Sequence, residues 1–247
     1  MRETGACKGS AGARRGLMLS AMSTALVPPV EVVIPWRDAP TRRAPFALVR
    51  RWYETHLPEA SVRTIDTDDD VFVLAACRNL AMRTAHPDAV VVIGDADTLP
   101  EAEPLRAAIA AARTSGRVHL PYDQYRWLGA NGSAEYAAGT PLIDCTVEQY
   151  VEGACSGVYV ATPQTWFAHG GQDEAFRGWG FEDAAWYLTH QAVLGEPPRR
   201  HEGRVYALHH AAEQRVGAGY EANEARMGLY RAAASDPGAI ARLVGIS

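Results

Sequence analysis

Short apolar runs alternate with amphipathic segments along most of the chain, a pattern typical of an α/β fold. Residues 30–34 and 89–93 are continuous β-branched or apolar runs that predict buried strands, and the second predicts a central parallel strand. Shorter runs predict further strands at 61–66, 117–121, 155–161 and 204–210. Apolar spacing predicts helices at 42–55, 71–84, 101–114, 163–169 and from 184 onward, followed by one or two C-terminal helices. The alternation predicts one α/β domain, with a mostly parallel central sheet flanked by helices.

The segment 122–151 breaks this alternation because its periodicity is weak. It carries several aromatic residues, namely Tyr122, Tyr125, Trp127 and Tyr136. Long aromatic segments without clear periodicity are typical of binding loops or lids, which is the structure we expect here.

Residues 1–28 are small, polar and rich in glycine and alanine, which predicts a disordered leader. Arg14 and Arg15 ahead of a short apolar stretch imitate a secretory signal, and a translation start at Met18 or Met22 is a further alternative. We expect a catalytic domain over 29–215 and C-terminal helices over 216–247 packed on that same domain. No run approaches the roughly 20 apolar residues of a membrane span.

Composition narrows the function classes. Apolar residues make up 47% and charged residues 21% of the chain, as in ordinary globular proteins. The net charge is −5 for the whole chain, and leaving out residues 1–28, with four basic residues and one acidic, changes it to −8. That balance disfavours a nonspecific nucleic-acid binder. Because Lys8 is the only lysine, the rest of the chain has no lysine for a Schiff base or a phosphate-binding P-loop.

The cysteines show no C-x-x-C spacing and no dense framework, which argues against a zinc ribbon or a disulfide scaffold. They are Cys7, Cys77, Cys145 and Cys155. A reducing, cytoplasmic compartment is therefore expected.

The stretch 168–183 has a composition that neither a regular helix nor a strand would favour. Its glycines are Gly170, Gly171, Gly178 and Gly180. Glycine permits positive φ and close approach of the backbone, and Trp179 offers an apolar face between two of them. Glu182 and Asp183 would lie at the N-terminus of the next helix, where the helix dipole stabilises their ionised form. This stretch is either a glycine turn with acidic capping residues or a ligand loop with a catalytic carboxylate.

Two further groups of polar residues follow predicted strands. Asp95 and Asp97 come directly after the central strand, where they can share a divalent cation or form an Asx turn that caps the following helix; we favour the cation. Arg37 and Asp38 follow the first strand, at the edge where open α/β sheets bind ligands.

Other polar clusters favour plainer interpretations. The acidic turn 66–70 is expected to be a solvated helix start rather than a site. Arg199 and Arg200 are expected in a solvated loop, although loops near the last strand could contact phosphate. Most histidines are expected to be surface or hydrogen-bonded core residues, namely His56, His86, His119, His169, His190 and His201.

Four separated motifs together resemble the metal-dependent GT-A glycosyltransferases, in particular the β-1,4-galactosyltransferase group and related family 2 bacterial and phage enzymes. They span most of the chain and are Val-Ile-Pro-Trp-Arg-Asp ending at Asp38, Cys77-Arg-Asn79, Asp95-Ala-Asp97, and the Gly170 to Asp183 stretch with Gly-Trp-Gly-Phe-Glu-Asp. The last motif is the specific one, since Asp-x-Asp alone is common by chance.

The resemblance implies roles for named residues. Pro35, Arg37, Asp38 and Arg78 would lie at the uridine diphosphate of a UDP-sugar. Asp97 and His210 would bind Mn²⁺ or Mg²⁺ with Asp95 nearby, toward the metal or the ribose. A methionine that also ligates in the galactosyltransferases is replaced by Ala207, so His209 or water would complete the shell. Trp179 and Gly180 would pack against the sugar, Glu182 would bind hydroxyls, and Asp183 would be the catalytic base.

The expected activity is therefore transfer of a hexose from a UDP-sugar to a hydroxyl of a saccharide or other glycan-type acceptor. The intact Glu182 and Asp183 pair favours inversion at the anomeric carbon, because retaining relatives generally have an asparagine in place of the second acid. Two alternatives remain: a phage-type enzyme that modifies DNA bases, and a sugar-nucleotide-binding module without catalysis.

Overall fold

The centre of the protein is a six-stranded sheet. A computed structural model describes Met1, residues 28–211 and residues 216–246. The sheet consists, in spatial order, of β2 (Ser61–Ile65), β1 (Val30–Pro35), β3 (Val90–Gly94), β8 (Val158–Ala161), β5 (His119–Leu120) and β9 (Arg199–Arg200). Only β8 runs against the others. The mostly parallel sheet predicted from the sequence is confirmed, and the whole of β3 is buried as its apolar run predicts.

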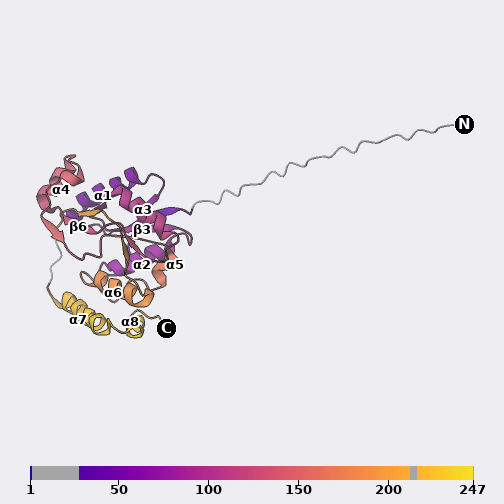
Figure 1. Cartoon of the computed structure of the whole chain (residues 1–247). Coiled ribbons are helices and arrows are strands. Elements are labelled where there is room, and N and C mark those ends of the chain that lie inside the picture. The colour runs from indigo at the N-terminus through magenta and orange to yellow at the C-terminus, as the bar shows by residue number, and fades with distance from the viewer. Residues whose placement is uncertain (2–27, 212–215, 247) are drawn as a thin grey trace.

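Helices cover both faces of this sheet (Figure 1). On one face lie α1 (Arg43–His56) and α3 (Ala102–Ala112); on the other lie α2 (Leu74–Thr84), α5 (Pro163–Phe167) and α6 (Glu182–Leu194). A short 3₁₀ turn, η1 (Pro40–Arg42), precedes α1. The apolar side chains between these layers form one large core. The β1-α1-β2 connection runs one way across the sheet, and the β2-α2-β3 connection runs back the other way, past β1. Because such crossovers are right-handed, the two helices lie on opposite faces.

Two C-terminal helices, α7 (Ala218–Ala233) and α8 (Pro237–Leu243), pack outside α6 (Figure 1). Their contact forms a second, smaller apolar cluster, which consists of Phe176, Ala185, Met227, Tyr230 and Ile240. Two members of this cluster come from outside the C-terminal helices: Phe176 from the glycine-rich stretch and Ala185 from α6. The C-terminal helices therefore pack on the same elements that carry the candidate site.

The segment 122–151 is not the long loop that its weak periodicity predicted. It contains β6 (Gln124–Trp127), α4 (Gly129–Ala137), the 3₁₀ turn η2 (Leu142–Asp144) and β7 (Gln149–Val151). The two strands join β4 (Thr98–Pro100) and β10 (Arg204–Ala207) in a second sheet, with the order β4-β10-β6-β7. Short strands carry too few alternating positions to be recognised from periodicity, and their order comes from pairing with distant partners.

Two other expectations change for the same reason. Arg199 and Arg200, expected in a loop, form β9 because they pair in parallel with β5. The acidic turn does not start a helix: α2 begins at Leu74, while Asp66 and Asp69 pair with Arg37 and Arg177. The structures of β9 and of the acidic turn are therefore determined by residues far away in the sequence, which a local pattern does not reveal.

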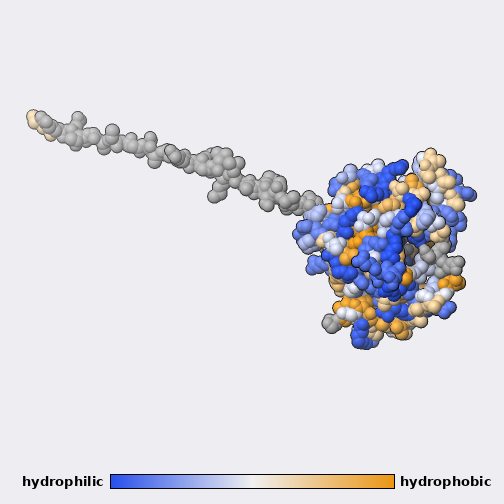
Figure 2. All heavy atoms as spheres, turned by 180° about the vertical axis from the view of Figure 1, so that it is seen from behind, coloured by the Kyte–Doolittle hydropathy of each residue, from blue (hydrophilic) through white to orange (hydrophobic). Residues whose placement is uncertain are grey.

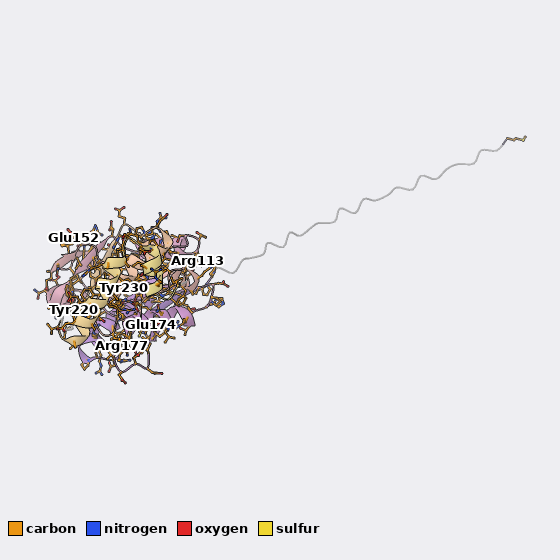
Figure 3. All side chains as sticks on the ribbon, turned by 90° about the horizontal axis from the view of Figure 1, so that it is seen from below. Arg113, Glu152, Glu174, Arg177, Tyr220 and Tyr230 are labelled. Carbon is orange, nitrogen blue, oxygen red and sulfur yellow. The ribbon has the colours of Figure 1, made fainter. Side chains whose placement is uncertain are left out.

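The two edges of the central sheet have different neighbours. The carboxyl ends of the parallel strands lie together along one side of the sheet, which we call its carboxyl edge. Arg113, after α3, lies on the opposite side, where these strands begin. In Figure 3 Arg113 is on the opposite side of the molecule from Glu152 and Tyr220, which flank the carboxyl edge. The face visible in Figure 2 mixes hydrophilic residues with small apolar patches.

The predicted leader and its alternative starts lie outside the described residues, and no helix within 28–211 or 216–246 is long and apolar enough to cross a membrane.

Histidines form a buried cluster between β5, α5, α6 and β9. His119 Nδ1 lies 2.8 Å from His201 Nε2, and the rings of His169 and His190 are 4.9 Å apart. Burial lowers the pKa of His119 to about 4, of His169 to about 3 and of His190 to about 4. These histidines are core residues, as expected, and they are neutral in the folded protein near pH 7.

The cluster predicts loss of stability in acid. A histidine whose folded pKa lies below its ordinary 6.5 stabilises the fold above pH 6.5, and that contribution falls as protons bind the unfolded chain at lower pH. His169 lies against Trp166 and Trp186, and its Nε2 has no hydrogen-bond partner among the described residues. His169→Phe should therefore reduce the slope of unfolding free energy against pH, between about pH 6 and pH 4, by close to 1.4 kcal/mol per pH unit.

Urea unfolding at a series of pH values measures that slope. His56→Gln, at an exposed position on α1, is the matched control and should leave the slope unchanged. Equal slopes for wild type and His169→Phe would contradict the assignment.

Candidate functional site

A fully buried arginine joins the candidate residues at the carboxyl edge of the sheet. Arg78 Nη2 donates to both carboxylate oxygens of Asp95, at 2.8 and 3.1 Å, and Nη1 donates to Gln172 Oε1 at 3.1 Å. Its Nη1 is also 3.5 Å from Glu182 Oε1, and its guanidinium lies 4.8 Å from the ring centroid of Tyr159. The side chain of Arg78 has no exposed surface, and it positions two acidic groups.

The two aspartates after β3 turn to different partners. Asp95 binds Arg78, whereas Asp97 Oδ2 lies 2.7 Å from His210 Nε2. Hydrogen bonding to Asp97 raises the pKa of His210. Burial raises the pKa of Asp95, and the charge of Arg78 opposes that rise. The Asx-turn interpretation fails, since β4 follows the aspartates and the carboxylate of Asp95 is held by Arg78.

Asp97 and His210 come together because the strands after them pair. Ala207 in β10 lies opposite Thr98 in β4, and Leu208 donates its backbone N–H to the Asp97 carbonyl at 2.7 Å. The predicted pairing of a histidine after the last strand with the Asp-x-Asp turn is thus seen in the structure. His209 is exposed and Ala207 offers no ligand atom, so neither adds to this pair. Within the described ranges, no group of three or more His, Cys, Asp and Glu side chains could hold a metal ion.

Glu182 and Asp183 begin α6, as the sequence predicted. The helix follows directly on Phe181, a non-glycine residue with a φ of 73°. Burial, followed by the charge of Asp183, raises the pKa of Glu182 to about 7, although the charge of Arg78 opposes that rise. Asp183 is more exposed than Glu182, and its Oδ1 accepts the Ala184 N–H at 2.7 Å. The two acids therefore differ: Glu182 is anchored below the surface and Asp183 faces outward.

The first half of the glycine-rich stretch is fixed by Asn79 of α2. Asn79 Oδ1 accepts from Trp166 Nε1 at 2.8 Å and from the Gln172 N–H at 2.9 Å, while its amide group donates to the Gln172 carbonyl at 2.7 Å. Gly171 passes so close that a Cβ there would lie 2.5 Å from Asn79 Oδ1. Glycine is required at this position for space and for its φ of 71°.

The second half of the stretch is held by α7, a contribution that the sequence reasoning missed. Asn223 exchanges hydrogen bonds with the backbone of Arg177 at 3.2 and 3.0 Å, and Tyr220 stacks on Trp179 with ring centroids 6.1 Å apart. Asp173 accepts from Tyr230 at 2.7 Å. Figure 3 shows Tyr220 and Tyr230 on α7 beside the loop that carries Arg177. The helical spacing of Tyr220, Asn223 and Tyr230 was the signal available in the sequence.

The residues after β1 lie at the same edge, toward β2. Arg37 makes a two-pronged contact with Asp66, with Nε–Oδ2 of 2.8 Å and Nη2–Oδ1 of 2.9 Å. Pro35 is buried at the end of the strand. Asp38 is exposed and pairs with Arg43, which lowers the pKa of its carboxyl group. The structure thus places Arg37 beside the edge and turns Asp38 toward α1.

Solved structures with the same arrangement come from glycosyltransferases. The catalytic domain of Drosophila β1,4-galactosyltransferase 7 in complex with xylobiose aligns with a TM-score of 0.55 and 14% identity over 80% of each chain. A mutant of that enzyme with manganese, UDP-Gal and xylobiose aligns with a TM-score of 0.51 and 12% identity over 79% of each chain. The chain has a GT-A fold. GalNAc-T7 with UDP, GalNAc and Mn²⁺ shares this GT-A fold, with a TM-score of 0.50 and 11% identity over 84% of this chain and 50% of that one. No protein-family model and no curated protein sequence matches the chain.

The contacts around the glycines predict that two substitutions in the glycine-rich stretch lower the free energy of unfolding by different amounts. Gly171 and Gly178 have nearly equal φ values of 71° and 73°, but the nearest atom to a Cβ at Gly178 is 3.9 Å away. Each alanine pays about 1–2 kcal/mol for the left-handed backbone. Gly171→Ala also disturbs the hydrogen bonds of Asn79, so it should cost at least about 2 kcal/mol more than Gly178→Ala in urea unfolding. Equal costs would show that Asn79 does not fix the loop.

Proposed function

We propose that the protein is a glycosyltransferase that moves a sugar from a UDP-sugar to an acceptor hydroxyl with inversion at the anomeric carbon. The observation that carries the proposal is the juxtaposition of two acidic pairs at one sheet edge, Asp95 and Asp97 after β3 and Glu182 and Asp183 at the start of α6, joined through Arg78. The GT-A neighbours, whose complexes include UDP-Gal or UDP with manganese, support the donor class.

Asp97 and His210 are our candidates for a divalent metal. Their Oδ2 and Nε2 atoms are already 2.7 Å apart and both side chains are partly exposed, so one ion could replace the hydrogen bond between them. Two protein ligands suit an ion that takes its remaining ligands from diphosphate and water. A histidine beside a carboxylate favours Mn²⁺ over Mg²⁺. When bound, the metal would neutralise the charge that develops on the leaving diphosphate.

Asp183 is our candidate for the catalytic base. Glu182 is held below it near Arg78, which leaves Asp183 as the outward carboxylate of the pair. The acceptor oxygen forms its bond to the anomeric carbon, the bond from that carbon to the diphosphate oxygen breaks, and the hydroxyl proton moves to a carboxylate oxygen of Asp183. Attack from the face opposite the leaving group inverts the anomeric carbon.

The remaining residues supply orientation. Glu182, with a pKa of about 7, can donate or accept a hydrogen bond to a sugar hydroxyl near neutral pH. Trp179, half-exposed and stacked on Tyr220, offers an aromatic face to the sugar, with Gly180 beside it. Pro35 and Arg37 lie at the β1 side of the edge, where we assign the uridine diphosphate. Arg78 positions Asp95 and Glu182.

The experiment that tests the proposal is UDP release from a panel of UDP-sugars, with and without Mn²⁺ and with mixed acceptors. Release with at least one donor, increased by Mn²⁺, is expected. Tight UDP binding without release would favour a binding module, and transfer to DNA would favour a base-modifying enzyme. Neither binding nor release with any UDP-sugar would refute the proposal.

Asp183→Asn tests the base. We expect transfer to fall by about 10²–10⁴-fold, the usual contribution of general base catalysis, while UDP affinity is kept. Asp88→Asn, at an exposed position on the amino edge of β3, is the matched control and should transfer at the wild-type rate. Wild-type turnover of Asp183→Asn would show that Asp183 is not the catalytic base.

Asp97→Asn and His210→Ala test the metal site. Both should lose Mn²⁺ binding, measured by the electron paramagnetic resonance signal of free Mn²⁺ in the presence of UDP. His209→Ala is the control, because the neighbouring histidine is exposed and outside the Asp97 contact. If both site variants bind Mn²⁺ with wild-type affinity, the metal does not bind at Asp97 and His210.

A further inference from the structure

Strand β9 directs two adjacent arginines to opposite faces of the sheet. Arg199 is the register partner of His119 in β5, so it shares the sheet face of the histidine cluster. Arg200 faces the other way and donates from Nη2 to the Ala154 carbonyl at 2.6 Å. The two cations on one short strand therefore have different surroundings.

Two aromatic rings hold the guanidinium of Arg200 in place. It lies 5.7 Å from the ring centroid of Tyr122 and 5.9 Å from that of Tyr187. Tyr187 lies one helical turn after Asp183 on α6, so it shares a helix face with the proposed base. The aromatic contacts set the orientation of a side chain that would otherwise be flexible.

Arg200 also acts on the groups that face Asp183. Burial raises the pKa of the Cys155 thiol, the charge of Asp183 raises it further, and Arg200 lowers it. Tyr122 responds to the same two charges. Geometry agrees with this shared influence, since Arg200 contacts the Tyr122 ring and, through Tyr187, the helix that carries Asp183.

The sheet order puts Arg200 on the side away from the proposed nucleotide. Arg37 follows β1, whereas Arg200 ends β9, three strands beyond β3 in the order β3-β8-β5-β9. Three spacings correspond to about 14 Å. A UDP-sugar bound at the β1 side thus leaves Arg200 for the acceptor.

Among the described residues, the charge of Arg200 has no carboxylate counterion. Across residues 28–211 and 216–246, no carboxylate forms an ion pair with it, whereas Arg78, Arg204 and Arg226 each have one. Ala154 uses one of the five N–H donors of the guanidinium. A half-buried cation with spare donors in a fixed plane is suited to a carboxylate or phosphate of a ligand, which it can bind through two parallel hydrogen bonds.

We propose that Arg200 selects an acceptor saccharide that carries an anionic group, a carboxylate or a phosphate, near the hydroxyl that Asp183 deprotonates. The carboxyl edge also carries the partly exposed carboxyl groups of Asp97 and Asp183, which disfavour an anion. Arg200 compensates that repulsion at the far side from the donor. This inference rests on the proposed transferase function and adds the chemical class of its acceptor.

The test compares matched acceptors with the full-length protein and the donor found in the UDP-release panel. Methyl glucoside, methyl glucuronide and methyl glucoside 6-phosphate differ only in the group at C6. We expect a KM at least tenfold lower for one or both charged acceptors than for the neutral one. The carboxylate and phosphate arms identify which anion is preferred.

Arg200→Gln should raise the KM of the preferred charged acceptor by about 10- to 100-fold, with kcat and the neutral acceptor changed less than about twofold. Arg199→Gln, its neighbour on the opposite face, should leave every KM unchanged. Arg200→Lys keeps the positive charge but not the planar set of guanidinium donors, so it should show an intermediate KM. It replaces the glutamine variant if that variant does not fold.

A binding measurement separates this inference from the proposed function. Saturation-transfer NMR should detect methyl glucuronide or methyl glucoside 6-phosphate on the wild type and a weaker signal on Arg200→Gln, whether or not turnover occurs. Equal KM values for all three acceptors, or equal effects of Arg199→Gln and Arg200→Gln, would overturn the role of Arg200. Absence of both UDP binding and UDP release would instead refute the transferase, while the NMR comparison would still decide the anion site.

Discussion

The candidate site depends on one buried cation. Arg78 comes from α2 and reaches Asp95 at the end of β3, Glu182 at the start of α6 and Gln172 in the glycine-rich stretch. A buried charge is costly unless it is paired and hydrogen-bonded, so Arg78 and its partners require each other. This mutual requirement brings three segments that are far apart in the sequence to one place, and it gives Asp95 a different partner from that of Asp97.

Sequence reasoning predicted the parts of the molecule that have strong local signals. The β-branched runs became β1 and β3, the acidic pair at 182–183 starts α6, and Asp97 meets His210. The GT-A fold implied by the four motifs is confirmed by the solved neighbours. Local pattern was sufficient for the two strands and the helix start because each is encoded within a few residues, whereas the fold and the Asp97–His210 contact followed from the resemblance.

The sequence could not predict features that arise from pairing between distant segments. The second sheet needs β4, β6, β7 and β10 to meet, and none of these short strands has a pattern of its own. Likewise, the burial of Arg78 is not visible in the three residues of its motif, because it depends on segments elsewhere in the chain. The support of the glycine-rich stretch by α7 was missed since helix α7 was recognised only by its composition.

The reversed direction of β8 has a consequence for how the protein folds. Gly157, the residue just before β8, supplies a carbonyl that accepts from the Asp95 N–H at 2.7 Å and from Thr98 Oγ1 at 2.8 Å. The Asp95 turn is thus completed by a segment about sixty residues later in the chain. Contacts of such sequence separation form late, because the chain first loses the conformational entropy of closing the intervening loop. The loop that presents the two aspartates therefore takes its final shape only when the sheet is assembled, so a chain still emerging during synthesis would not yet hold the acidic edge in place.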